Sequence, residues 1–253
     1  MANALTPLAT YALRLGDDSL ILGQRLGEWC GHAPALEVDL SLANLALDQV
    51  GQATHFLAVA GEIEGKGRDA DALAFRRDVM DFTNCLLVEQ PNGDFAQTIA
   101  RQFLFSHYQE LLFAALAASK DQRFAAIAAK AVKETTYHAT LASDWVVRLG
   151  DGTDESKARM IAGLDWMWRF ADELFVMDDV DAAAIEVGCG VDRAALRRAW
   201  DQRIDAVLAD AALERPAPHR PVLGGRAGRH SEHLGHLLSE MQFLQRAYPG
   251  ATW

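Results

Sequence analysis

The chain has 253 residues, of which 50% are hydrophobic, enough for a substantial core in one large domain or two small ones. Its formal net charge of −11 argues against general binding to nucleic acid or to an anionic membrane, because the field of the chain would repel phosphates. The cysteines, Cys30, Cys85 and Cys189, are widely spaced without a C-x-x-C pair, so they indicate neither a disulfide framework nor a zinc site.

Neither end of the chain nor its interior carries a membrane signal. Residues 1–19 lack a basic segment followed by an apolar run, and no apolar segment approaches the roughly 20 residues that a spanning helix needs. With cysteines typical of reduced thiols, these features predict a cytoplasmic protein with no membrane partner.

Apolar residues recur at helical spacing almost throughout, whereas the alternation typical of strands is hard to find, which predicts an all-α fold. We expect a first helix from about Leu8 to Trp29. Pro34 suits the first turn of a second helix, with Glu37 near its positive end. The polar, glycine-bearing residues 61–71 are expected to form a linker after it.

The second half of the chain continues the helical pattern. Asp94 and Gln97 resemble a capping box that opens a third helix, which should run to about Ser119. A fourth helix is expected from Phe124 to Leu149. Three more are expected at about 155–177, 192–213 and 230–247, and the prolines and glycines of residues 214–229 predict a loop between the last two.

The first four helices would form two hairpins, and the second helix of each carries a histidine. His55 lies three residues after Gln52, and His138 lies three residues after Thr135. In a ferritin-like four-helix bundle the corresponding helices each supply a Glu-x-x-His motif. Two histidines alone can also be a coincidence, since any long helix of this composition can carry one. The prediction is one ferritin-like domain over residues 1–253, with a core bundle at about 8–149 and additional C-terminal helices at about 155–247.

The residues expected at the metal-ligand positions are mostly of the wrong type. A di-iron carboxylate centre needs hard carboxylate oxygens besides its histidines, but Gln52 and Thr135 occupy the glutamate positions. The facing depths, expected near residues 22–24 and near Ser106, hold no carboxylate; Glu28 and Glu110 lie about one turn away. The sequence therefore predicts no catalytic residue, no metal and no cofactor in this chain, and a degenerate site at Gln52, His55, Thr135 and His138.

A different metal site is the alternative. Glu134 lies four residues before His138, so the two side chains could share a helix face and chelate one ion. Such a pair is also common on ordinary helices. The alternative function is a free-standing metal-dependent oxidase with an unusual site around His55, Glu134 and His138.

The loop before the last helix concentrates positive charge in an otherwise acidic chain. Arg226, Arg229 and His230 are candidates for contact with a phosphate-bearing substrate or with an acidic partner surface. A solvated loop is an equally good interpretation.

Several local strings together resemble one family, the C subunits of bacterial phenylacetyl-CoA epoxidases. They are LRLGD at 13–17, QRLGEWCGHAP at 24–34, LVEQPNGDFA at 87–96, KETTYH at 133–138, HSEHLG at 230–235, EMQFLQR at 240–246 and the terminal PGATW. The strings are long and extend over nearly the whole chain, so the resemblance is specific.

The resemblance implies a ferritin-like structural subunit of a multicomponent monooxygenase in aerobic phenylacetate catabolism. In that family a related A subunit holds the di-iron centre and epoxidises the ring of phenylacetyl-CoA with O2. A small B subunit and a reductase with FAD and an iron-sulfur cluster complete the complex, and NADPH supplies the electrons. The C subunit pairs with the A subunit and is regarded as non-catalytic, and the basic loop could then share in holding the CoA phosphates.

Overall fold

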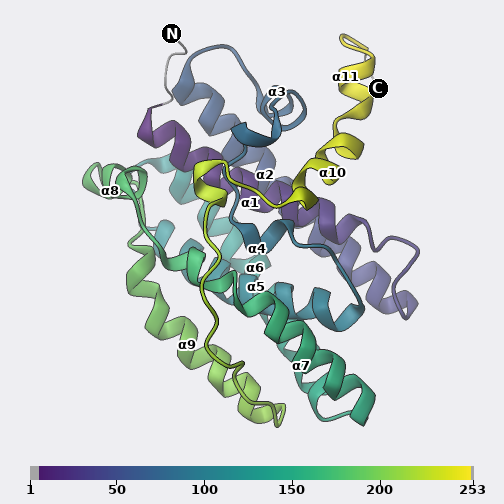
Figure 1. The fold of residues 1–253 in the computed structure, drawn as a ribbon. Helices are drawn as coiled ribbons and strands as arrows, with labels where there is room; N and C mark the ends of the chain where they lie inside the picture. Colours follow the sequence, from purple (N-terminus) through teal and green to yellow (C-terminus); the bar gives the residue numbers. More distant parts are fainter. Residues whose placement is uncertain (1–5, 252–253) are drawn as a thin grey trace. The chain divides into compact units, whose positions relative to one another are not determined.

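The structure, a computed structural model, describes residues 6–251, and every regular element within that range is a helix (Figure 1). The all-α prediction is confirmed, and the helix content is consistent with the ferritin-like class. The last two residues of the PGATW string lie outside the described residues. No helix between residues 6 and 251 is both long and apolar enough to cross a membrane.

The chain forms two compact units. Unit 1 contains the residues up to Gln90, residues 179–184 and those from Gly224 on, and unit 2 contains residues 91–178 and 185–223. The expectation of a single domain over the whole chain stays a prediction.

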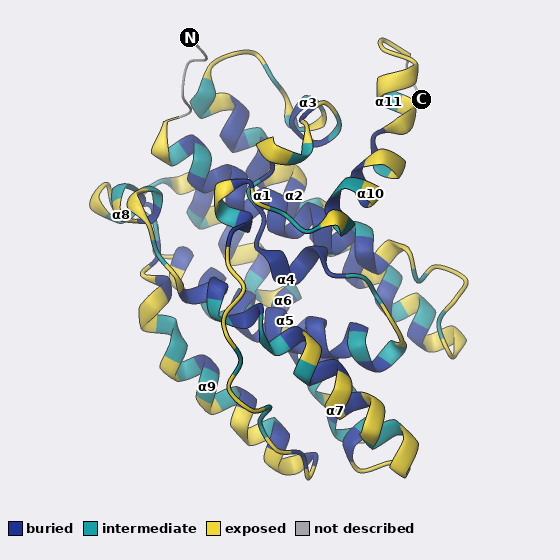
Figure 2. Ribbon diagram, in the orientation of Figure 1, coloured by how far each residue is buried: buried dark blue, intermediate teal, exposed yellow. Residues whose placement is uncertain are grey.

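Unit 1 is built on two long helices, α1 (Pro7–Gly27) and α2 (Leu36–Glu64). Thr6 caps α1 by accepting a hydrogen bond from the Ala9 amide, and Pro7 occupies the first helical position, where its missing N–H costs nothing. Nearly all of α1 is buried, and it is dark blue along most of its length in Figure 2. Gly16 permits this close packing, because a Cβ there would lie 2.8 Å from the side chain of Leu57 on α2.

Shorter elements complete unit 1. They are α3 (Ala70–Phe75), η1 (Val79–Asp81), α4 (Leu86–Glu89), η3 (Gly225–Ala227), α10 (Glu232–Met241) and α11 (Phe243–Ala247). The elements α3, η1, α4 and η3 were not predicted from the sequence, because elements of so few residues show no helical period. Residues 230–247 were predicted as one helix, but they form the two helices α10 and α11. The break between α10 and α11 falls at Gln242, whose side-chain amide donates to the carbonyl oxygens of Ala74 and Arg77.

Two predicted boundaries in unit 1 were wrong. Pro34 precedes α2 instead of lying in its first turn, because Asp39 of that turn accepts a hydrogen bond from the Gly31 amide at 2.7 Å and holds the preceding residues in a turn. The predicted linker at 61–71 is only partly a linker, because α2 extends to Glu64 and α3 begins at Ala70. Gly65 ends α2 in the left-handed conformation, and Asp69 caps α3 by accepting from the Ala72 amide.

Unit 2 contains α5 (Phe95–Leu116), α6 (Gln122–Gly150), α7 (Asp154–Trp168), η2 (Ala171–Phe175) and α9 (Arg193–Asp210). Asp94 caps α5 as predicted by accepting from the Gln97 amide. The Gln97 side chain, however, donates to the carbonyl oxygen of Pro91, so the reciprocal half of the capping box is missing. The buried Trp200 joins α9 to α5 by donating its indole N–H to the Leu104 carbonyl oxygen at 2.9 Å.

The structure differs from the prediction at two further places. The helix expected at 155–177 consists of α7 and the separate 3-10 turn η2. The helix α8 (Asp179–Glu186) was not predicted, because its eight residues are too few for a clear period.

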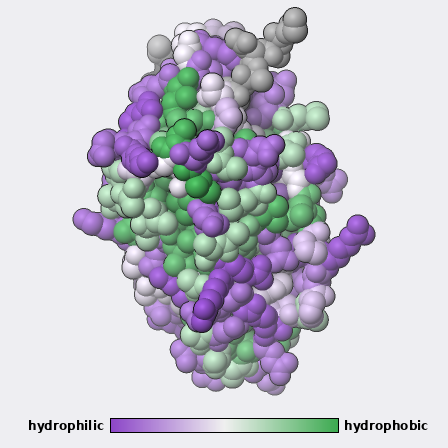
Figure 3. Space-filling model, turned by 90° about the vertical axis from the view of Figure 1, so that its left-hand side faces the viewer, coloured by the Kyte–Doolittle hydropathy of each residue, from purple (hydrophilic) through white to green (hydrophobic). Residues whose placement is uncertain are grey.

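The molecular surface mixes polar and apolar residues. On the face drawn in Figure 3, hydrophobic side chains gather in patches between hydrophilic ones. Large apolar side chains that are exposed occur on several helices, and four of them lie on α2.

Candidate functional site

The buried polar positions of α2 are Gln49 and Gln52, three residues apart on the side of the helix that lies in the core of unit 1. The Ser19 hydroxyl of α1, also buried, donates to the amide oxygen of Gln52 at 3.5 Å. All three side chains are neutral. The interior of this helix pair therefore carries a polar, uncharged cluster at the spacing that a Glu-x-x-His motif would have.

His55 is exposed, which corrects its assignment to the degenerate site. Starting from Leu45, steps of four and three residues lead along the buried side to Gln49, Gln52 and Phe56 and pass over His55. The same spacing of apolar residues is visible in the sequence, so the exposure of His55 could have been predicted from it. The histidine was chosen for its residue type instead of its position on the helix.

The expected facing depth in unit 1 was also wrong. Ser19 is the residue of α1 that meets Gln52, whereas Gly23, within the predicted window of 22–24, packs beside Gln49. The prediction assumed that the two hairpins are equivalent in length. The turn before α2 shifts the register between α1 and α2 by about one helical turn.

In unit 2, Thr135 and His138 are both buried on α6, as the degenerate-site prediction requires. The Thr135 hydroxyl donates to the carbonyl oxygen of Ala131, one turn earlier in the same helix, at 3.0 Å. This is the usual partner of a threonine inside a helix, so Thr135 occupies its buried position without adding a charge.

Ser106 was predicted to face this part of α6, but the residues of α5 that contact it lie one to four positions later in the sequence. Thr136 donates to the Glu110 carboxylate at 3.1 Å, and His107 contacts the Ser143 hydroxyl at 2.9 Å. Glu110 is therefore at the depth of Thr136, which corrects the expectation that it lies a turn away. It also forms an ion pair with Arg203, so its negative charge already has a cationic partner.

The donor sets of the two helix pairs do not fit a di-iron centre. Around Gln52 the α1–α2 pair offers neutral serine and glutamine side chains, and the two buried aspartates of α1 are each paired with an arginine. In the α5–α6 pair the carboxylates of Glu110 and Glu134 are each paired with a cationic side chain. Neutral amides and hydroxyls are weak iron ligands. Among residues 6–251, no three or more His, Cys, Asp or Glu side chains are grouped so that they could hold a metal ion.

The three residues of the alternative site differ in their exposure to solvent. His55 is exposed, His138 is buried, and the Glu134 carboxylate is half-buried and paired with Lys130.

Buried His107 differs from an ordinary histidine in its protonation. Burial, with a smaller contribution from the positive charge of Arg203, lowers the pKa of His107 from 6.5 to about 4. The imidazole is therefore neutral at physiological pH.

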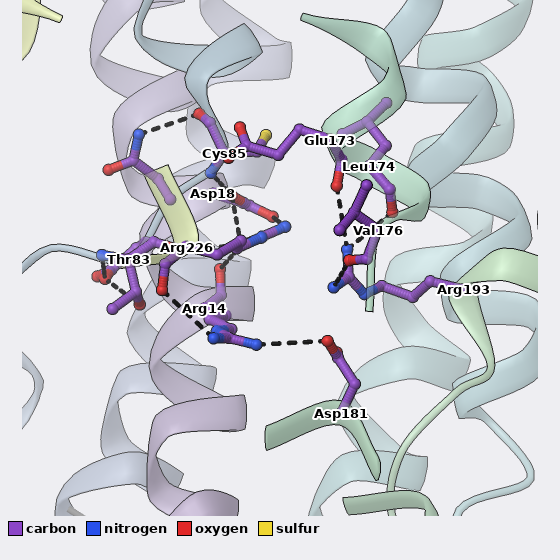
Figure 4. Close-up of polar contacts among 12 residues, drawn as sticks. Arg14, Asp18, Thr83, Cys85, Glu173, Leu174, Val176, Asp181, Arg193 and Arg226 are labelled. Atoms are coloured by element: carbon purple, nitrogen blue, oxygen red, sulfur yellow. Dashed lines mark hydrogen bonds and ion pairs between the residues drawn. The ribbon is translucent and has the colours of Figure 1, made fainter. Parts of the chain in front are cut away.

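Charged residues also concentrate inside unit 1, around Asp17 and Asp18 of α1. Asp17 pairs with Arg77 and accepts hydrogen bonds from the amide and hydroxyl of Thr83 at 2.8 and 3.0 Å. Asp18 pairs with Arg226 at 2.6 Å and accepts from the Cys85 amide at 2.7 Å (Figure 4). These contacts attach the segments around residues 77–85 and 226 to α1.

Glu89 is the third buried carboxylate of this network. It contacts His230 Nδ1 at 2.7 Å and accepts from the Asn84 side chain and the Ser231 amide. Burial alone would lower the pKa of His230, but the Glu89 carboxylate and the Phe82 carbonyl oxygen outweigh it and raise that pKa above its ordinary value.

Arg14 extends the network on α1. Its guanidinium pairs with Asp181 at 3.4 Å and donates to the Arg226 carbonyl oxygen at 3.3 Å (Figure 4). Arg14, Asp17, Glu89 and His230 all belong to the strings LRLGD, LVEQPNGDFA and HSEHLG. Those strings therefore contain residues that hold unit 1 together.

This network changes the interpretation of the basic loop. The Arg226 side chain is 10% exposed and the His230 side chain 1% exposed, and each is directed at an internal carboxylate. Neither is placed to contact CoA or a partner, so the prediction for these two residues was wrong. The sequence could not reveal this, because their partners lie more than 140 residues away. Arg229 is exposed, and its assignment stays a prediction.

Comparison with known proteins agrees with the resemblance found in the sequence. The family model described as phenylacetic acid catabolic protein matches residues 1–253. The chain is 50% identical over 249 residues to the C subunit of the 1,2-phenylacetyl-CoA epoxidase of Escherichia coli strain K12, an alignment that covers 98% of this chain and 100% of that protein.

Proposed function

Because the chain belongs to the phenylacetic acid catabolic protein family, we propose that it is the non-catalytic C subunit of a phenylacetyl-CoA epoxidase. It pairs with the catalytic A subunit and supports it in the epoxidation of the ring of phenylacetyl-CoA. The observation that carries the non-catalytic role is the set of side chains at Glu-x-x-His spacing, Gln49 and Gln52 on α2 and Thr135 and His138 on α6, which includes no carboxylate.

The chemistry of buried charge supports this role. A cluster of buried carboxylates is stable when a metal compensates its charge, and without the metal it destabilises the fold by several kcal/mol. Neutral glutamine and threonine side chains remove that requirement. The protein can therefore fold and remain rigid without iron, which suits a supporting partner.

The assembled enzyme would contain the A subunit with its di-iron centre and the small B subunit. A reductase that carries FAD and an iron-sulfur cluster would deliver electrons from NADPH, and the complex would work in the cytoplasm. In this arrangement the chain provides no cofactor ligand, and its contribution is structural.

The test is to purify the chain alone and together with the A subunit of the same organism, and to measure iron and molecular mass in both samples. We expect well below stoichiometric iron in the chain alone, and a stable complex of defined mass when both are present. Stoichiometric iron with O2-dependent turnover by the isolated chain would refute the non-catalytic role.

The same samples test the free-standing oxidase. That function requires His138→Ala to abolish metal binding and turnover. We expect this substitution to change only stability or partner affinity, because His138 is buried and belongs to no group of three or more His, Cys, Asp or Glu side chains among residues 6–251 that could hold a metal ion.

Arg229 provides a separate test of a CoA contact. If this exposed cation meets a CoA phosphate in the complex, Arg229→Glu should raise the KM for phenylacetyl-CoA several-fold while the isolated protein keeps its stability. An unchanged KM would leave Arg229 as solvated surface.

A further inference from the structure

Helix α2 carries apolar residues on two sides. One stripe, which includes Val38, Leu42, Leu45 and Phe56, is buried in unit 1. A second set of large apolar side chains points to solvent: Leu36 is 72% exposed, Leu40 57%, Leu47 69% and Val50 36%. A helix that is apolar on both sides is typical of one covered on both sides, and contiguous exposed apolar surface on a soluble protein marks an interaction site.

The spacing of the exposed set is that of a helix seam. Together with the half-buried Ala43, the four exposed residues occupy positions 36, 40, 43, 47 and 50, which are separated by alternating steps of four and three residues. This is the pattern of the contact positions in a two-helix coiled coil. At 1.5 Å per residue, they extend over about 21 Å of the helix. We call these five residues the α2 face.

The charges beside the α2 face determine which partner it suits. Glu37, Asp39 and Asp48 lie in the same segment, and α2 contains no lysine or arginine between Leu36 and Glu64. In a symmetric contact with a second copy, acidic residues would oppose acidic residues, which costs affinity. A helix flanked by lysine and arginine would instead form complementary pairs.

We propose that the α2 face is the docking site of a helix from the catalytic subunit, whose apolar seam is flanked by basic side chains. This inference rests on the proposed function, which supplies the partner, and adds where and by what chemistry that partner binds. Leu40 and Leu47 form the centre of the contact, because they are the large exposed side chains in the middle of the α2 face.

The experiment measures the affinity of the full chain for the purified catalytic subunit by calorimetry or biolayer interferometry. Leu47→Glu and Leu40→Glu place a charge in the seam, and Leu47→Ala is a milder change if either of these impairs folding. Ile161→Glu is the matched control, because Ile161 is 50% exposed on helix α7 of unit 2. Circular dichroism of every variant checks that the helices are intact.

We expect Leu47→Glu and Leu40→Glu to weaken binding by at least about tenfold and Leu47→Ala by a smaller factor, with Ile161→Glu close to the unsubstituted chain. Glu37→Lys should weaken binding several-fold, and its effect should shrink at high salt.

The other outcomes are distinguishable. If the unsubstituted chain binds the catalytic subunit and the α2 variants bind it within about twofold as well, the docking site is wrong and the proposed function stands. If the unsubstituted chain does not bind the catalytic subunit at all, the proposed function fails and the inference with it. If the chain alone forms a dimer that Leu47→Glu dissociates, the occupant is a second copy, which overturns the inference.

Discussion

Replacing Arg226 tests the assignment of this residue to the interior of unit 1. In Arg226→Met the apolar stem is kept, but Asp18, 3% exposed, loses the guanidinium that contacts both of its oxygens at 3.0 and 2.6 Å. Removing one partner of a buried ion pair leaves an uncompensated charge and typically costs about 3–5 kcal/mol. The Cys85 amide still donates to Asp18, so we expect a loss near the lower end, about 3 kcal/mol.

The assay is calorimetric unfolding of the isolated chain, in which a loss of about 3 kcal/mol should lower Tm by roughly 6–12 °C for a protein of this size. Arg229→Met is the matched control. It removes an exposed guanidinium three residues away and should change stability by less than about 0.5 kcal/mol.

The double variant Asp18→Asn with Arg226→Met removes both charges, so it should recover part of the stability that Arg226→Met loses. A decrease below about 1 kcal/mol in Arg226→Met would contradict the structural role of the pair. Such a small decrease would mean that the Arg226 side chain is available to contact CoA or a partner.

Three other predictions concern packing and protonation. Gly61→Ala should destabilise the chain by more than about 1 kcal/mol, because a Cβ at residue 61 would lie 2.0 Å from the Arg68 carbonyl oxygen. Gly51→Ala in the same helix is the control: a Cβ at residue 51 meets nothing within 4 Å and should stabilise the chain by about 0.5–1 kcal/mol. Urea unfolding of the two variants measures both changes. His107 has a lowered pKa, so the unfolded chain binds the proton first as the pH falls. Its contribution to stability should decline by about 3 kcal/mol between pH 6.5 and 4, a loss that His107→Gln should remove in unfolding curves recorded across that range. His230 has a raised pKa, so its contribution to the free energy of unfolding is fully present below pH 6.5 and is lost as the pH rises through the pKa of the folded state. His230→Gln should therefore flatten the alkaline side of the plot of stability against pH. An unchanged plot would contradict the pairing of His230 with Glu89.

The sequence by itself determined the helical class, the positions of the long helices and the absence of a Glu-x-x-His motif from the predicted second and fourth helices. Helical periodicity depends on neighbouring residues, so α1, α2, α5 and α6 could be predicted to within a few residues. Thr135 and His138 were correctly expected on the buried side of α6, because local spacing determines which residues share a face.

Only the tertiary structure decided which polar residues meet. Gln49, and not His55, lies with Gln52 on the buried side of α2, which depends on how the helix is rotated in the core. Glu110 lies at the depth of Thr136, which depends on the register between α5 and α6. Arg226 appeared in the sequence as part of a basic loop, but its partner Asp18 lies 208 residues away. Pairings across such separations depend on chain topology, and no local pattern of residues encodes them.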